Sequence, residues 1–174
     1  MKFENIELDG IDAQGNEQKI KLSDLKGKNI VLYFYPKDNT PICTKEAGNF
    51  RDAISKLPKD TVVIGVSPDN VESHKNFLKK HNLNFHILSD TEQKLAKAFK
   101  NLKADAIQTI DELKDKIEDK TIKMKKKMFE KDNRPMTMRS TFIIGKDGKL
   151  LKAMRDIDIK GHVDEVVEFV KSLK

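Results

Sequence analysis

Two continuous apolar runs, each followed by a proline, are the clearest pattern along this chain. The first covers residues 30–35 and stops at Pro36, and the second covers residues 61–66 and comes just before Pro68. Runs that are apolar at nearly every position are typical of strands that are buried on both faces, as in α/β proteins. We therefore predict a buried strand in each of these two segments.

Helical spacing of apolar side chains follows the first strand. These side chains recur at steps of four and three residues and share one helical face; they are Cys43, Ala47, Phe50, Ile54 and Leu57. Pro58 ends the pattern. Further helices are predicted over residues 71–81 and 91–102, with a short strand at residues 85–88 between them.

The last part of the chain combines a hairpin signal with a helix. Residues 141–144 and 150–153 flank a Gly-Lys-Asp-Gly turn, and residues 163–173 are amphipathic with helical spacing. The order of elements is βαβα first and a hairpin with a helix last. We therefore predict one α/β domain over residues 1–174, with a mixed central sheet flanked by helices in a thioredoxin-like layout.

Residues 101–135 form a strongly charged segment before this hairpin. Residues 105–119 hold six acidic residues and two lysines, whereas residues 120–134 hold seven basic and two acidic residues. An acidic start suits the dipole of a helix, so we predict a helical insertion of one helix or two. A solvated extra helix is the simplest interpretation. Self-association, contact with a partner, and a lid over the site stay open.

Composition narrows the class of function. The 34 basic and 28 acidic residues give a net charge of +6, and the two signs are mixed almost everywhere. This favours a soluble surface and no nucleic-acid partner. No apolar run approaches the roughly 18–20 residues that a membrane span needs, so we expect no membrane contact. The N-terminus has no apolar signal-peptide core, and one unpaired cysteine suits a reducing compartment, so we predict a cytoplasmic location.

That single cysteine, Cys43, is the strongest candidate for chemistry. It excludes an internal disulfide and a site with several cysteine ligands. Thr40 is a good N-cap and Pro41 is favoured at the first helical position, which places Cys43 at the third. Free backbone N–H groups and the helix dipole stabilise a thiolate there, and the thiolate is the nucleophilic form. From placement alone, a small cysteine packed in the core explains the residue equally well.

Residues 35–46 read Tyr-Pro-Lys-Asp-Asn-Thr-Pro-Ile-Cys-Thr-Lys-Glu. This segment contains a proline, Pro36, then a threonine after three intervening residues, Thr40, and then a cysteine after two more, Cys43. This pattern resembles the active-site signature of peroxiredoxins, and in particular of their bacterioferritin-comigratory-protein (Q-type) subgroup. Further matches follow in the same order at residues 65–69, 88–90 and 139–142. The likeness covers about residues 1–100 and 136–174, and it implies the peroxiredoxin variant of the thioredoxin-like fold.

The resemblance implies a thiol peroxidase that reduces hydrogen peroxide and small organic hydroperoxides. Cys43 is then the peroxidatic thiol, which is oxidised to a sulfenic acid. Thr40 hydrogen-bonds the thiolate and the peroxide, Arg139 supplies positive charge to both, and Pro36 shields the thiolate from water. Glu46 also matches the pattern, in a supporting role. The family needs no metal, flavin or haem, so we expect no cofactor.

One position departs from the subgroup. Many members carry a second, resolving cysteine five residues after the first, where this chain has Gly48. A one-cysteine cycle follows, in which an external thiol (a thioredoxin, a glutaredoxin or a small thiol) reduces the sulfenic acid. We expect a monomer or a weak homodimer. The alternative is a peroxide sensor that passes its oxidation to a partner protein.

The four histidines do not suggest a metal site. His81 and His86 have no cysteines or carboxylates clustered with them, and His74 and His162 lie in helical patterns where we expect them to face solvent.

Overall fold

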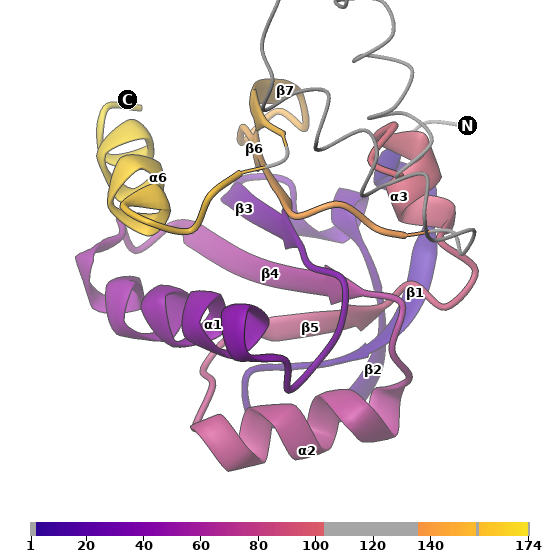
Figure 1. The fold of residues 1–174 in the computed structure, drawn as a ribbon. Coiled ribbons are helices and arrows are strands. Elements are labelled where there is room, and N and C mark those ends of the chain that lie inside the picture. Colours follow the sequence, from indigo (N-terminus) through magenta and orange to yellow (C-terminus); the bar gives the residue numbers. More distant parts are fainter. Residues whose placement is uncertain (1–2, 103–135, 156, 174) are drawn as a thin grey trace, which may run out of the picture.

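The computed structural model describes residues 3–102, 136–155 and 157–173 (Figure 1). The predicted helical insertion lies outside these residues, except for Asn101 and Leu102. That residues 1–174 form one domain stays a prediction.

The described strands form one mixed sheet, in the order β2-β1-β5-β4-β3-β6-β7. Its three central strands β5, β4 and β3 run parallel, and the remaining pairs are antiparallel. The strands span Glu7–Ile11 (β1), Glu17–Lys21 (β2), Asn29–Phe34 (β3), Thr61–Ser67 (β4), His86–Ser89 (β5), Ser140–Ile144 (β6) and Leu150–Met154 (β7). The predicted mixed sheet is confirmed.

Helices cover both faces of this sheet (Figure 1). They span Pro41–Ala53 (α1), Val71–His81 (α2), Lys94–Ala98 (α3) and His162–Lys171 (α6), with 3₁₀ turns at Phe3–Asn5, Leu22–Leu25 and Ile54–Lys56. On one face, α1, α2 and α6 pack against a core that includes Tyr33 and Phe50. On the other face, α3 packs against a core that includes Phe34 and Phe142. The sequence periodicity predicted the first of these layers well, because Cys43 and the rest of its apolar stripe face the sheet.

The hairpin β1–β2 was not predicted. Its strands have five residues each, and β2 buries only Ile20, so neither forms a clear apolar run. The turn between them is fixed by Asp12, whose carboxylate accepts the backbone N–H groups of Gln14 and Asn16. An Asp at the start of a Gly-containing turn was the available signal.

The predicted helix over residues 91–102 was too long. Gln93 and Lys100 both have positive φ angles, 55° and 53°, and they bound α3 on either side. The buried carboxylate of Asp90 accepts the N–H groups of Leu95 and Ala96, which fixes where the helix begins. These two left-handed residues limit the helix to Lys94–Ala98.

The prediction that His74 and His162 face solvent was wrong. Their side chains are 0% and 3% exposed. His162 Nε2 forms a hydrogen bond of 2.7 Å with Thr141 Oγ1. His74 occupies the apolar face of α2 beside Phe77 and Leu78. A histidine at this spacing belongs to the buried stripe of its helix.

Candidate active site

Cys43 lies in the first turn of α1, where the loop from β3 enters the helix. Pro41 is the first helical residue, and Thr40 has the extended backbone of an N-cap. The N–H of Thr44 donates to the Thr40 carbonyl at 2.9 Å, which closes the first turn. Cys43 is 1% exposed and packs against the sheet. The predicted start of the helix is confirmed.

The side chain of Thr40 does not cap the helix as we expected. Its hydroxyl instead donates to the Lys37 carbonyl at 3.3 Å. Asn39, directly before Thr40, has a left-handed φ of 62°. Pro36 is half-buried in the same loop. The roles of Thr40 and Pro36 toward a peroxide stay predictions.

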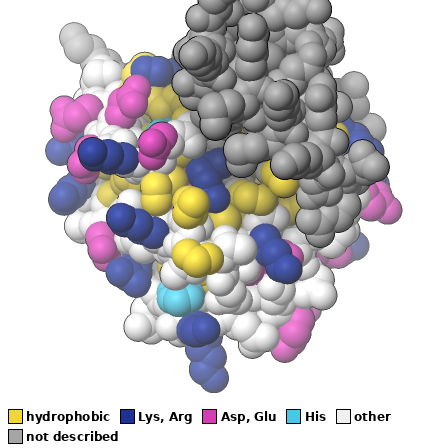
Figure 2. Space-filling view, viewed as in Figure 1, with side chains coloured by type: hydrophobic (Ala, Val, Ile, Leu, Met, Phe, Trp, Pro, Cys, Tyr) yellow, Lys and Arg dark blue, Asp and Glu magenta, His cyan; other side chains and the backbone are white. Residues whose placement is uncertain are grey.

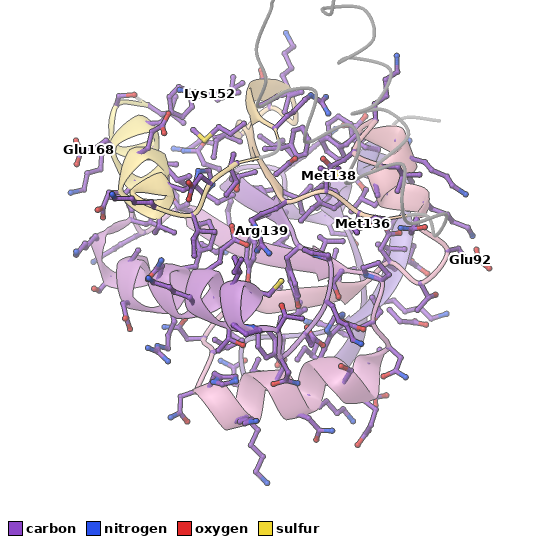
Figure 3. The ribbon with its side chains drawn as sticks, in the orientation of Figure 1. Glu92, Met136, Met138, Arg139, Lys152 and Glu168 are labelled. Atoms are coloured by element: carbon purple, nitrogen blue, oxygen red, sulfur yellow. The ribbon has the colours of Figure 1, made fainter. Side chains whose placement is uncertain are left out.

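Arg139 reaches this helix start from the segment before β6 (Figure 3). Its Nη2 donates to Cys43 Sγ at 3.1 Å, and its Nη1 donates to Glu46 Oε1 at 2.8 Å. One planar guanidinium therefore joins two groups on the same face of α1, which uses the fork geometry that arginine provides. The structure brings together three of the predicted site residues, although Arg139 lies 96 positions from Cys43.

Hydrogen bonds fix the backbone at Arg139 and at the residues on either side of it. Asn101 donates its side-chain N–H to the Met138 carbonyl at 2.8 Å and accepts from the Ser140 hydroxyl at 2.6 Å. The Arg139 carbonyl accepts the N–H of Ile157 at 2.9 Å. Buried Asn101, which sequence reasoning missed, therefore fixes the backbone that carries the guanidinium.

The electrostatics of the site are set by two opposing effects on Glu46. Its side chain is 1% exposed, and this burial raises its pKa to about 7, although Arg139 acts in the opposite direction. For Arg139, burial acts in the direction of a lower pKa. The negative charges of Glu46 and Cys43 and their hydrogen bonds outweigh this effect, so the pKa of Arg139 lies above its usual value. The guanidinium therefore keeps its charge next to the sulfur.

On the face that carries the site, several apolar side chains lie next to a basic side chain near the centre of the view (Figure 2). Figure 3, in the same orientation, places Arg139 at this position. Ile42, directly before Cys43, is 56% exposed. A small molecule that approaches the sulfur along α1 would therefore meet an apolar residue next to a fixed positive charge.

Sequence reasoning also missed a buried carboxylate in the loop, Asp38. It is 4% exposed and lies close to His74, with 2.7 Å between Oδ2 and the ring Nδ1. The signal was present, because an acidic residue lies inside the motif and a histidine lies on the apolar face of α2. Neither residue touches Cys43 in a hydrogen bond within the described part of the chain.

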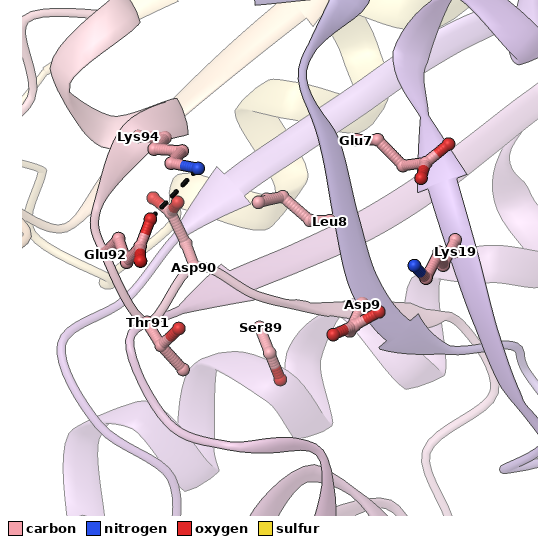
Figure 4. A pocket seen from close by; sticks show the side chains of 9 residues that line it. All are labelled: Glu7, Leu8, Asp9, Lys19, Ser89, Asp90, Thr91, Glu92 and Lys94. Atoms are coloured by element: carbon pink, nitrogen blue, oxygen red, sulfur yellow. Dashed lines mark ion pairs between the residues drawn. The ribbon is translucent and has the colours of Figure 1, made fainter.

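Away from Cys43, a polar pocket of about 260 Å³ lies between the β1–β2 hairpin and the end of β5 (Figure 4). Its lining includes Asp9, Lys19 and Asp90, and none of the predicted site residues. Among residues 3–102, 136–155 and 157–173, no group of three or more His, Cys, Asp or Glu side chains is arranged to hold a metal ion. No helix in the same ranges is long and apolar enough to cross a membrane.

Comparisons with known proteins agree with this geometry. The model of the AhpC/TSA family matches residues 2–153. Peroxiredoxin Bcp of Bacillus subtilis is 42% identical over 173 residues, which cover 99% of this chain and 94% of that protein. The chloroplastic peroxiredoxin Q of Sedum lineare is 34% identical over 165 residues, which cover 94% of this chain and 73% of that protein.

Solved structures are similar as well. A cysteine-to-serine variant of Xanthomonas campestris peroxiredoxin Q superposes with a TM-score of 0.76 at 27% identity, over 98% of this chain and 92% of that one. The bacterioferritin comigratory protein of the same organism, described for its alkyl peroxide reduction activity, superposes with a TM-score of 0.72 at 28% identity, over 95% and 90% of the two chains.

Proposed function

This chain belongs to the AhpC/TSA family, as a Bcp/PrxQ peroxiredoxin with a single cysteine, and on that premise we propose that Cys43 alone carries its peroxidase cycle. The resemblance seen in the sequence and the predicted thioredoxin-like fold are both confirmed by these relatives. The chain is a thiol-dependent peroxidase, which reduces hydroperoxides with electrons from a thiol.

In the proposed first step, the Cys43 thiolate attacks one oxygen of the peroxide. The S–O bond forms as the O–O bond breaks, the leaving oxygen takes a proton and departs as water or an alcohol, and the sulfur becomes a sulfenic acid. An external thiol then condenses with the sulfenic acid and releases water. A second thiol reduces the resulting mixed disulfide and returns Cys43 to its starting state.

The contact between Arg139 and the sulfur supports this step most directly. A guanidinium at 3.1 Å from Cys43 Sγ stabilises the thiolate before the reaction. The same positive charge lies close to the oxygen on which negative charge develops as the O–O bond breaks. Donors that are already in place at such a position lower the barrier without reorganisation.

The substrate class follows from the exposed surroundings of the sulfur. Hydrogen peroxide needs only the charged part of the site. Ile42 offers an apolar contact to the alkyl group of a small organic hydroperoxide, since it is 56% exposed beside Cys43. The external reductant is a thioredoxin, a glutaredoxin or a small thiol. A cytoplasmic location and a monomer or weak homodimer stay predictions.

The test is the rate of reaction of fully reduced protein with hydrogen peroxide, followed by mass spectrometry, with the Cys43→Ser variant as background. We expect a rate far above that of free cysteine, a sulfenic acid on Cys43, and turnover when a generic thiol is added. A rate no faster than that of free cysteine would exclude the peroxidase cycle. A fast reaction without turnover, but with a lasting mixed disulfide to one specific protein, would favour the peroxide sensor instead.

A Gly48→Cys substitution should convert the protein to a two-cysteine cycle. A Cβ at Gly48 would meet only the Arg51 guanidinium at 3.7 Å, so a side chain fits there. Residues five positions apart on a helix have Cα atoms about 8–9 Å from each other, and a disulfide requires less than about 7 Å. The disulfide can therefore form only when α1 unwinds after Cys43 is oxidised.

We expect mass spectra of the oxidised Gly48→Cys protein to show an intramolecular disulfide and little sulfinic acid after excess peroxide. The Gly48→Ser variant has a side chain of similar size without a thiol and should accumulate sulfinic acid on Cys43. Equal amounts of sulfinic acid in both variants would show that α1 does not open far enough for residue 48 to reach the sulfur.

A further inference from the structure

A buried acid–base pair lies behind the loop that carries the site. Asp38 is 4% exposed and His74 is 0% exposed, and His74 Nδ1 lies 2.7 Å from Asp38 Oδ2. Charged groups are rarely buried unless they are paired and hydrogen-bonded. The peroxidase chemistry proposed for Cys43 does not use either residue, so the pair needs its own explanation.

Asp38 is held by more than the histidine. The Tyr35 hydroxyl donates to Oδ1 at 2.6 Å, and the Ser73 hydroxyl donates to Oδ2 at 2.8 Å. The backbone N–H of Asp38 donates to Asp69 Oδ2 at 2.6 Å. Its side chain is thus tied to α2 and its backbone to the segment after β4, so the loop is fixed from two directions.

The protons of the pair follow from the partners. His74 Nε2 lies 3.1 Å from the Leu88 carbonyl oxygen, which can only accept, so Nε2 carries a hydrogen. Nδ1 faces the carboxylate oxygen Oδ2 of Asp38, and a hydrogen bond between these two atoms needs one further proton. With that proton the His74–Asp38 pair has no net charge. Burial, followed by the Asp38 charge, raises the pKa of Tyr35, so its hydroxyl stays protonated and donates.

The pair acts on the part of the loop that determines where α1 begins. Asn39 directly follows Asp38 and has a φ of 62°, a conformation that is uncommon for residues other than glycine. Such a residue persists only where its surroundings fix it. Thr40 follows as the N-cap, and Cys43 lies in the first turn of the helix. The contacts of Asp38 therefore fix the backbone from which the sulfur is presented to Arg139.

We propose that the buried Asp38–His74 pair is a positioning element of this peroxidase, in which His74 holds the loop before α1 and so aligns Cys43 with Arg139. The inference rests on the proposed function of Cys43 and adds to it a residue that touches neither sulfur nor peroxide. His74 links three separate parts of the fold: α2, the end of β5 through Leu88, and the active-site loop through Asp38.

Two amide substitutions at His74 separate the two contacts of the ring. His74→Asn places an amide nitrogen near the position of Nδ1 and can still donate to Asp38. His74→Gln places it near Nε2 and keeps only the contact with the Leu88 carbonyl. Leu78→Ala serves as the control for lost packing, because Leu78 is buried on the same helix and belongs to its apolar face.

Each full-length variant is reduced, its melting temperature is measured, and its rates with hydrogen peroxide and with iodoacetamide are compared. Alkylation is measured at a pH above the pKa of a free thiol, about 8.5, so that it needs a reachable thiolate but no alignment with Arg139 or a peroxide. For His74→Gln we expect the peroxide rate to fall by about 10- to 100-fold, the size of effect that misplacement of a reacting group produces, while alkylation changes little. His74→Asn should keep most of the peroxide rate, and Leu78→Ala should lose stability only.

Equal peroxide rates in His74→Asn and His74→Gln would overturn the inference, as would a wild-type rate in His74→Gln. So would a loss in Leu78→Ala as large as that in His74→Gln. If His74→Gln does not fold, the Ser73→Ala variant provides the test. It removes one hydrogen bond to the Asp38 carboxylate and should lower the peroxide rate by at least about threefold, the lower end of what one hydrogen bond contributes. An unchanged rate there would also overturn it. A slow wild-type protein would instead reject the proposed function, before any variant is compared.

Discussion

Replacement of Arg139 by methionine is expected to lower the rate constant of the reduced protein with hydrogen peroxide by about 10²–10³-fold, the usual effect of removing one fixed donor to a developing oxyanion. Methionine keeps much of the length and apolar contact of arginine but removes both hydrogen bonds of the guanidinium, to Cys43 and to Glu46. The measurement is stopped-flow kinetics with excess peroxide, with the oxidation state of Cys43 confirmed by mass spectrometry.

Two further substitutions test whether the loss of rate comes from the guanidinium of Arg139. Arg139→Lys keeps a positive charge but cannot join both groups as a planar fork does, so we expect a rate between those of the wild type and the methionine variant. Arg155→Met removes another arginine, which donates to the Phe99 and Lys100 carbonyls away from Cys43. This control should react with peroxide at the wild-type rate. A fast Arg139→Met protein would mean that the helix start alone activates the sulfur.

The parts of the fold that were predictable from the sequence are those where burial imposes a simple period. Strands β3 and β4 are buried along most of their length and so appear as apolar runs. The stripe that begins at Cys43 was visible because one face of α1 packs on the sheet. The β1–β2 hairpin at the edge of the sheet has no such run, because buried and exposed positions alternate along much of β1 and only Ile20 is buried in β2.

The candidate site was only partly visible for a related reason. A motif identified Cys43 and its helix start, but a local pattern carries no distance to Arg139, which lies on a different element. The sequence predicted a solvent-facing His74 and a supporting role for Glu46, but it did not predict that both side chains are buried, because polar residues mostly lie at the surface. In both cases the helical spacing places the residue on the buried face of its helix. Glu46 lies three positions after Cys43 on α1, and His74 lies three positions before Phe77 on α2. A charged residue on an apolar stripe is therefore better interpreted as a buried, paired group.

Glu46 should contribute a loss of stability as the pH rises from 4.5 to about 7. Burial raises the pKa of Glu46 from 4.5 to about 7 in the folded state. Below 4.5 the carboxyl is protonated in both states, and the favourable uptake of a proton by the folded state is fully present. That contribution disappears as the pH rises through about 7, because the buried group must then ionise. A shift of this size corresponds to about 3 kcal/mol of unfolding free energy.

Urea unfolding of the wild type and of Glu46→Gln at several pH values between 4.5 and 7 measures this contribution as a difference. The difference is needed because other buried groups also titrate. Burial raises the pKa of Asp90, which adds a slope of the same sign, and burial lowers the pKa values of His86 and His162, which adds slopes of the opposite sign. Glutamine cannot ionise, so the variant should lack the part of the slope that belongs to Glu46. Glu168→Gln, at an exposed position on α6, removes a carboxylate of the same kind and should leave the slope unchanged. If Glu46→Gln and the wild type have the same slope, Arg139 holds Glu46 ionised throughout this range. The attraction between the two groups would then outweigh the burial of the carboxylate.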